Sequence, residues 1–171
     1  MLDFLFRRLT AEPRPGEALF GAATQEARQP YWYREAGVPD TLDSRFAMLS
    51  TVMALILVRL ERDDEQGNLV SVALTERFIE VMESEHRELG LGDPTLGRTV
   101  RKLVGSLSWR TDLWRRSAVG GCDWRDAVRQ SIYKDAPAED AQSYADAALK
   151  EFWSKLERAD LATLAEGRLN E

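Results

Sequence analysis

Cysteine and histidine are almost absent from this chain of 171 residues, which contains one of each, Cys122 and His86. A single cysteine excludes an internal disulfide, and it excludes metal sites built from several thiolates. A single histidine excludes any site that needs two imidazoles. The composition is otherwise ordinary, with 44% hydrophobic and 30% charged residues. These values are typical of a folded globular protein, and the length predicts one domain.

The sequence also lacks an apolar run long enough to cross a bilayer. Its most apolar stretch, from Phe46 to Val58, is 13 residues long, whereas a membrane-spanning helix needs about 20. We therefore expect this stretch to be a core helix of a soluble protein. Because the helix is apolar all round, it is either enclosed by its neighbours or offers part of its surface to an apolar partner.

The first 14 residues combine apolar side chains with two arginines, Arg7 and Arg8. A secretory leader places its positive charges before the apolar run and ends in small residues, and this segment does neither. We therefore expect no cleaved leader. Residues 1–14 are interpreted as an amphipathic turn or arm that docks on the body or rests on an anionic membrane, and residues 15–171 as one helical domain.

The sequence also lacks the alternation of apolar and polar residues that marks a β-strand. No segment of five residues or more repeats with a period of two. Apolar residues instead recur at helical spacing, and prolines and glycines, Gly67 among them, separate the periodic segments. The predicted fold class is all-α: a single-domain bundle of about seven helices around an apolar central helix. The expected helices are Gly16–Gln29, Leu42–Arg62, Leu69–Leu89, Pro94–Arg116, Trp124–Lys134, Ala138–Arg158 and Leu161–Glu166.

Aspartates precede several of these segments, and an aspartate carboxylate accepts hydrogen bonds from the free N–H groups in the first turn of a helix. The expected caps are Asp93, Asp123 and Asp160, together with Asp40 or Asp43 for the central helix.

No arrangement of residues predicts a catalytic or metal site. Glu83 and His86 have the spacing of one part of a di-iron site, but such a site needs a second histidine and inward-facing carboxylates. The glutamates of this segment lie opposite its apolar face, where we expect a solvent-exposed acidic surface. Cys122 lies in no nucleophile motif and is expected to be a small buried side chain. We therefore expect a protein without enzymatic activity, metal or cofactor.

The net charge of −6 is distributed unevenly along the chain. Residues 61–90 carry a net charge of −6, whereas residues 91–134 carry +5. The basic stretch is richer in arginine than in lysine and contains tryptophans, a composition suited to phosphate contacts and stacking. Its cations either pair with the acidic helices on both sides or form a docking surface for an anionic partner. They include Arg98, Arg101, Lys102, Arg110, Arg115, Arg116, Arg125 and Arg129.

Several short motifs occur in a distinctive order between about residues 15 and 116. They are Tyr31-Trp32-Tyr33, Gly37-Val38-Pro39-Asp40-Thr41-Leu42-Asp43-Ser44-Arg45-Phe46, Val58-Arg59-Leu60, Leu74-Thr75-Glu76-Arg77-Phe78, Arg87-Glu88-Leu89-Gly90-Leu91-Gly92-Asp93 and Val100-Arg101-Lys102. In this order and spacing the sequence resembles the ubiquinol–cytochrome c chaperone family, and it is similar to the short alphaproteobacterial members.

The resemblance implies a non-enzymatic assembly factor for the ubiquinol–cytochrome c reductase complex. Mitochondrial relatives act with a small partner protein at the ribosomal tunnel exit, where they receive newly made cytochrome b. The implied partners are therefore nascent cytochrome b, the ribosome and a small assembly-factor partner. The implied location is the cytoplasm, with peripheral contact at the inner face of the membrane. The alternative function is a ribosome- or RNA-binding module without a cytochrome client.

The residues expected to bind a client are aromatic. Three successive aromatic side chains cannot all face one core, so we expect at least one of the tripeptide 31–33 to be exposed. The alternative is a structural staple between two helices, with the hydroxyls hydrogen-bonded. The candidate client-binding residues are Tyr31, Trp32, Tyr33 and Phe46.

The residues expected to bind a ribosome or another partner lie in the basic stretch. The apolar pattern of the segment 94–116 places them on its outer face. They are Arg98, Arg101, Lys102 and Trp109.

Overall fold

The computed structural model of the protein describes residues 16–90 and 92–169, so the expected arm of residues 1–14 lies outside the described residues. All regular elements within the described ranges are helical, which confirms the all-α class. They comprise eight α-helices, six of them nine residues or longer, and a short 3₁₀ turn, η1 (Glu61–Asp63). The α-helices are α2 (Glu17–Ala27), α3 (Pro30–Arg34), α4 (Leu42–Leu60), α5 (Asp64–Glu88), α6 (Asp93–Ala118), α7 (Trp124–Ile132), α8 (Glu139–Arg158) and α9 (Leu161–Ala165).

The seven expected helices are all present, and α3 is an additional one. The main difference in their bounds is the start of α5, which begins at Asp64 instead of Leu69. Gly67 was expected to separate two segments, but it lies buried inside α5. A Cβ atom on Gly67 would lie 2.0 Å from the carbonyl oxygen of Leu60. The glycine therefore allows α5 to fold back closely against the end of α4.

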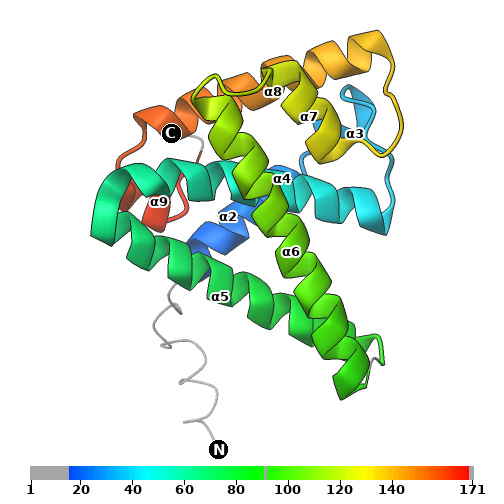
Figure 1. Ribbon diagram of the computed structural model, residues 1–171, viewed down its shortest axis with the longest axis vertical. Helices are drawn as coiled ribbons and strands as arrows, with labels where there is room; N and C mark the ends of the chain where they lie inside the picture. Colours follow the sequence, from blue (N-terminus) through cyan, green and yellow to red (C-terminus); the bar gives the residue numbers. More distant parts are fainter. Residues whose placement is uncertain (1–15, 91, 170–171) are drawn as a thin grey trace, which may run out of the picture.

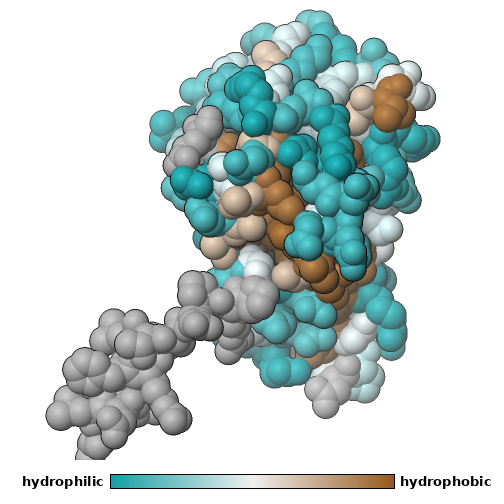
Figure 2. Space-filling model, turned by 90° about the vertical axis from the view of Figure 1, so that its left-hand side faces the viewer, coloured by the Kyte–Doolittle hydropathy of each residue, from teal (hydrophilic) through white to brown (hydrophobic). Residues whose placement is uncertain are grey.

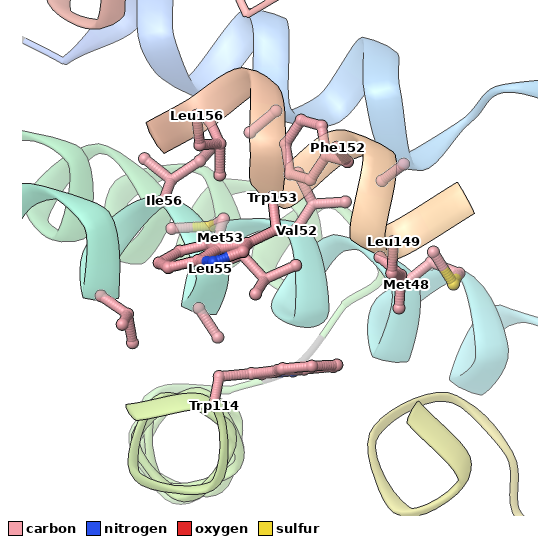
Figure 3. Packing of buried hydrophobic residues seen from close by; sticks show 14 of the residues in the cluster. Met48, Val52, Met53, Leu55, Ile56, Trp114, Leu149, Phe152, Trp153 and Leu156 are labelled. Atoms are coloured by element: carbon pink, nitrogen blue, oxygen red, sulfur yellow. The ribbon is translucent and has the colours of Figure 1, made fainter. Parts of the chain in front are cut away.

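Helix α4 is the centre of the molecule, as its apolar sequence predicts. It contacts α2, α5, α6, α7 and α8, and nearly every residue from Ala47 to Leu60 is buried. In Figure 1, α6 crosses in front of α4 while α8 runs along its other side. Figure 3 shows the resulting core, in which Trp114 of α6 and Trp153 of α8 approach α4 from different sides. Enclosure by neighbouring helices is thus the correct interpretation of α4 for most of its surface.

Buried polar side chains tie α4 to the second half of the chain. Thr51 Oγ1 lies 2.6 Å from Ser131 Oγ on α7, and the indole N–H of Trp114 donates to the same Ser131 oxygen at 3.1 Å. Arg59, only 7% exposed, donates through Nε to the carbonyl of Leu156 at 2.9 Å. It also donates through Nη2 to the carbonyl of Ala159 at 2.7 Å. These bonds fix the register of α4 against α7 and α8.

The N-terminal caps agree with the sequence at two helices and differ at two. Asp123 accepts from the N–H of Asp126 at 3.0 Å, and Asp160 accepts from the N–H of Thr163 at 2.8 Å. At α6 the N-cap position is occupied by Gly92, and the helix begins at residue 93. At α4 the cap is a threonine instead of an aspartate.

Two polar contacts complete the start of α4. The Thr41 hydroxyl oxygen accepts from the N–H of Ser44 at 3.2 Å, and Asp40 pairs with Arg45, with 2.6 Å between Oδ1 and Nε.

Apolar as it is, α4 does not have the length and hydropathy of a membrane span, and neither does any other helix within the described residues.

Candidate functional site

The aromatic tripeptide 31–33 lies in α3, a single turn that begins at Pro30. Trp32 is fully buried, and its indole N–H donates to the carbonyl of Glu26 at 3.0 Å. Tyr33 is half-buried and donates its hydroxyl to the carbonyl of Ala27 at 2.9 Å. Tyr31 is also half-buried and donates to the carboxylate of Glu26. The three rings therefore fasten α3 to the end of α2.

This geometry corrects the expectation that one of the three aromatic residues is exposed. None of them is exposed, and Trp32 has no surface to offer a client in this conformation. Burial, together with the neighbouring Glu26 carboxylate, raises the pKa of the Tyr31 hydroxyl well above its ordinary value. The hydroxyl thus stays protonated and remains a donor to Glu26. The staple between two helices, which was the alternative interpretation, describes the arrangement of this tripeptide.

Phe46 belongs to the one side of α4 that its neighbours leave partly uncovered. We call this side the α4 stripe. It contains Leu42, which is 75% exposed, and the half-buried residues Phe46, Leu49 and Leu57. At 3.6 residues per turn, these four positions lie within about 80° of one another around the helix. Met53 lies on the same side between Leu49 and Leu57 and is fully buried, so the accessible surface consists of one part from Leu42 to Leu49 and a second part at Leu57. The Phe46 ring contacts the buried ring of Phe78 on α5, with 6.2 Å between the centroids.

The C-terminal end of the α4 stripe opens into a cleft between α5 and α6. The cleft has a volume of about 380 Å³, with Leu57 as its apolar member and carboxylates, an amide and hydroxyls around it. Figure 2 shows an apolar strip between hydrophilic side chains on the side of the molecule where η1 and the start of α5 lie. The residues that line the cleft are Leu57, Glu61, Asp64, Asn68, Ser71 and Thr111.

The second candidate surface is the outer side of α6, which we call the basic stripe. In Figure 1 this helix lies in front of α4, and no described helix covers the side that faces the viewer. Arg98, Arg101 and Lys102 are exposed, and Trp109 is 44% exposed, as the apolar pattern predicts. Arg116 follows at position i+7 from Trp109 and is exposed on the same side of the helix. The basic stripe consists of Arg98, Arg101, Lys102, Trp109 and Arg116.

Ion pairing separates the cations of the basic stretch into two groups. Arg115 pairs with Glu61 at 2.6 Å, Arg125 with Glu139 at 2.6 Å, and Arg129 with Asp126 at 3.3 Å. The expectation that the acidic helices on both sides pair with the stretch is therefore correct for Arg115 and Arg125, whereas Arg129 pairs within its own helix. The four cations of the basic stripe form no ion pair with any described residue. Their charges remain available to a partner.

Arg110 differs from the other arginines because it points inward and is 9% exposed. Its Nε donates to the carbonyl of Ser131 at 3.0 Å, and its Nη1 lies 2.5 Å from the hydroxyl of Ser106. Its guanidinium carbon also lies 5.3 Å from the centroid of the Trp109 ring. Burial lowers the pKa of Arg110 to about 10. Arg110 therefore supports Trp109 from beneath and does not add to the exposed charge.

The structure assembles no metal or catalytic site from the residues that the sequence singled out. His86 Nδ1 lies 2.8 Å from the carbonyl oxygen of Met82, one turn earlier in the same helix. The thiol of half-buried Cys122 lies 3.8 Å from the carbonyl oxygen of Leu113. Within the described ranges, no three potential metal ligands come together. The surfaces that remain are suited to binding.

Comparison with known proteins connects these surfaces to a family. The sequence model of the ubiquinol–cytochrome c chaperones matches residues 34–170, which is four fifths of the chain. The chain belongs to the ubiquinol–cytochrome c chaperone family. The family match includes Phe46 and the whole basic stripe, whereas the tripeptide 31–33 lies before its first residue. Family membership confirms the resemblance seen in the sequence.

A solved structure has a fold similar to that of this chain. The crystal structure of the Cbp3 homolog from Brucella abortus is similar to this chain with a TM-score of 0.73 and 25% sequence identity. The similarity covers 98% of this chain and 94% of that chain, so the two proteins correspond over nearly their whole length. A comparison with curated proteins found no match.

Proposed function

We propose that this protein is a non-enzymatic assembly factor for ubiquinol–cytochrome c reductase that binds newly made cytochrome b. Family membership and the similarity to the Cbp3 homolog support the chaperone and assembly role. The observation that supports binding of a membrane-protein client is the α4 stripe. A chaperone for such a client needs apolar surface, and the stripe presents it on the helix that also forms the core.

In this proposal, an apolar segment of the client packs on Leu42, Phe46 and Leu49 of the α4 stripe. A second part of the client contacts the cleft at Leu57. Fully burying a leucine side chain stabilises a complex by roughly 2 kcal/mol, so contacts with Leu42 and its neighbours suffice for reversible holding. The polar rim of the cleft accepts the backbone or polar groups that flank an apolar segment. Release then needs no chemical step, metal or cofactor. Phe46 is the aromatic client contact of this proposal, and Trp32 acts only through the position of α3.

The basic stripe serves a different purpose, which is to hold the chaperone where its client appears. Its cations are unpaired within the described part of the chain, and its tryptophan is accessible. We propose that the protein acts in the cytoplasm at the inner face of the membrane, beside ribosomes that make the client. A small assembly-factor partner, as implied by the mitochondrial relatives, is part of this proposal.

The alternative function, a ribosome- or RNA-binding module without a client, would use only the basic stripe. The α4 stripe favours the client-binding function because an exposed leucine and a half-buried phenylalanine contribute nothing to phosphate binding.

Site-specific crosslinking to the client tests this choice. A photoreactive amino acid at position 42 or 46 is expected to crosslink to ribosome-bound nascent cytochrome b. The matched control places the same amino acid at Ala147, which is exposed on α8. Leu42→Asp should reduce the crosslink from position 46 several-fold without unfolding the protein, since Leu42 is 75% exposed. Equal crosslinking from position 147, or none from either stripe position, would contradict the proposed client surface.

A deletion strain tests the assembly role itself. The reduced-minus-oxidised spectrum of its membranes should lose the b- and c-type signals of the reductase, and the restored gene should return them. Other b-type oxidases should be unaffected. An unchanged spectrum, under conditions where the reductase is abundant, would contradict the assembly function. It would not affect the result of the crosslinking experiment.

A further inference from the structure

We propose that the basic stripe of α6 docks the protein directly onto an anionic lipid surface. This inference deepens the docking part of the proposed function, because it names the partner of the basic stripe. It stands on the geometry and charge of α6 and requires no particular client.

The charges of α6 are arranged for a flat anionic partner. Arg98, Arg101 and Lys102 lie toward one end of the helix and Arg116 toward the other, and all four are exposed on the same side by helical spacing. Arg98 and Arg116 are 18 positions apart, which corresponds to about 27 Å along a helix. Because α6 is one uninterrupted helix, cations at both ends contact a plane at the same time (Figure 1).

Cations outnumber acidic groups on α6. Helix α6 contains two acidic residues, Asp93 at its first position and Asp112. The Asp112 carboxylate pairs with Arg115, which also pairs with Glu61. Within the described residues, the outer side of the helix therefore has four cations without an ion pair, beside a group of Asp112, Arg115 and Glu61 whose charges sum to −1. The surplus negative charge of the chain is concentrated in residues 61–90 and 135–171, outside α6.

Val119, an exposed apolar side chain at the end of α6, favours lipid over RNA as the partner, whereas Trp109 suits either one. Trp109 lies between the two groups of cations, and Val119, 81% exposed, follows the last turn of α6. Tryptophan is characteristic of the membrane–water interface, where its ring lies at headgroup level. An exposed valine is stabilised by acyl chains, whereas it makes no useful contact with a phosphate–sugar backbone. Arg110, stacked at 5.3 Å from the Trp109 ring, holds that ring in place.

Co-sedimentation of the full chain with vesicles tests the inference. The probes are vesicles of phosphatidylcholine with 30% phosphatidylglycerol, vesicles of phosphatidylcholine alone, and a 20-nucleotide single-stranded RNA. We expect binding to the anionic vesicles and not to the neutral ones, and we expect it to weaken with salt because a mobile ion atmosphere screens exposed charges. No cytochrome b is present, so failure here is distinguishable from failure of client binding.

Charge reversal on the stripe supplies the decisive variant. Each cation near an anionic surface contributes about 1 kcal/mol, equivalent to about fivefold in affinity. Arg101→Glu combined with Lys102→Glu should therefore weaken vesicle binding by at least about 25-fold. The matched control, Arg34→Glu with Lys150→Glu, makes the same charge change at exposed positions of α3 and α8 and should bind almost normally. Circular dichroism confirms that both variants are folded.

The apolar contribution is tested by Val119→Asp and Trp109→Ala, each of which should weaken vesicle binding several-fold while leaving the fold intact. Anionic vesicles should also shift the fluorescence of the wild-type protein to shorter wavelength, and this shift should disappear in Trp109→Phe. Three results would overturn the proposal: no binding to anionic vesicles, equal loss in the stripe and control variants, or tighter binding to RNA that the two apolar substitutions leave unchanged.

Discussion

Asp146 is a carboxylate on α8 that is only 8% exposed. Its Oδ2 lies 3.7 Å from Nη1 of Arg125, and its Oδ1 has no hydrogen-bond partner among the described residues. Burial raises the pKa of this group, and Arg125 and Lys150 lower it by less. Ionised Asp146 therefore costs the folded state free energy that the unfolded chain does not incur.

Asp146→Asn should remove this cost. Because the folded pKa is raised above the unfolded value, the penalty is absent below the unfolded pKa and is fully present above the folded pKa. The variant should therefore be at least as stable as the wild type at neutral pH, and its advantage should shrink as the pH falls toward 4. Urea unfolding of both proteins across that pH range measures the difference. A variant that is less stable at pH 7 would show that the Arg125 pair outweighs burial.

At the scale of single residues, the sequence could predict which side chains are polar or apolar but could not predict their partners. Trp32 was expected to contact a client. Its ring is buried instead, and its indole N–H donates to the carbonyl group of Glu26 in the preceding helix. The same limit applies to Arg110, which is one of several arginines in the sequence. Its inward direction depends on Ser131 of α7. Such partners come from tertiary packing, which local spacing does not contain.

At the scale of elements, two glycines lie inside helices but in different surroundings. Gly67 lies where α5 approaches the end of α4, and a Cβ atom there would meet the Leu60 carbonyl oxygen at 2.0 Å. Gly105 lies in the middle of α6, where a Cβ atom would have nothing within 4 Å. The first glycine is required by a close approach of two backbones, and the second is not.

Alanine at these two positions should have opposite effects. Gly67→Ala should destabilise the protein by about 1–3 kcal/mol or more, because backbone atoms must move to admit the methyl group. Gly105→Ala should stabilise it by about 0.5–1 kcal/mol, since alanine has less conformational freedom to lose in a helix. Thermal unfolding of the two variants gives the comparison. Similar effects at both positions would contradict the close approach at α5.

At the scale of elements, the sequence predicted the helices and their buried faces well because apolar periodicity is a local property. The starts of helices were less predictable. Thr41 caps α4 although two aspartates lie nearby, since only the Thr41 side chain reaches the N–H of Ser44. The segment after Pro30 was expected to be a loop or a single turn between two helices, and it forms the short helix α3. Five residues carry too little periodicity to decide between these two forms.

At the scale of the whole molecule, helices that pack on one shared core are expected to unfold together in a single transition. Helices α2, α5, α6, α7 and α8 all pack on α4, and buried hydrogen bonds join residues 80 to 100 positions apart. We expect denaturation followed by circular dichroism and by tryptophan fluorescence to coincide. Arg59→Met should lower the midpoint, reducing stability by about 2 kcal/mol or more, since it removes charged hydrogen bonds to two carbonyl groups. Two separate transitions in the wild type would contradict a single cooperative core.

The two candidate surfaces were predictable to different degrees. The outward direction of Arg98, Arg101 and Lys102 followed from the apolar pattern of their helix. Their lack of ion pairs with described residues did not, because it depends on which acidic residues the fold brings near. The α4 stripe was also beyond the sequence, since an all-round apolar helix does not reveal which side its neighbours leave uncovered. Phe46 was a candidate client contact from the sequence and stays a prediction, whereas Leu57 was not a candidate.

The long sequence separation of the contacts around α4 has a consequence for the synthesis of this protein. Arg59 bonds to Leu156, 97 positions later, and a ribosome adds about 5–20 residues per second. The apolar helix therefore emerges roughly 5–20 seconds before the segment that closes over it is made. During that interval the nascent chain displays the same kind of surface as the membrane proteins it is proposed to protect. A chaperone with this topology is itself vulnerable to aggregation while it is being made.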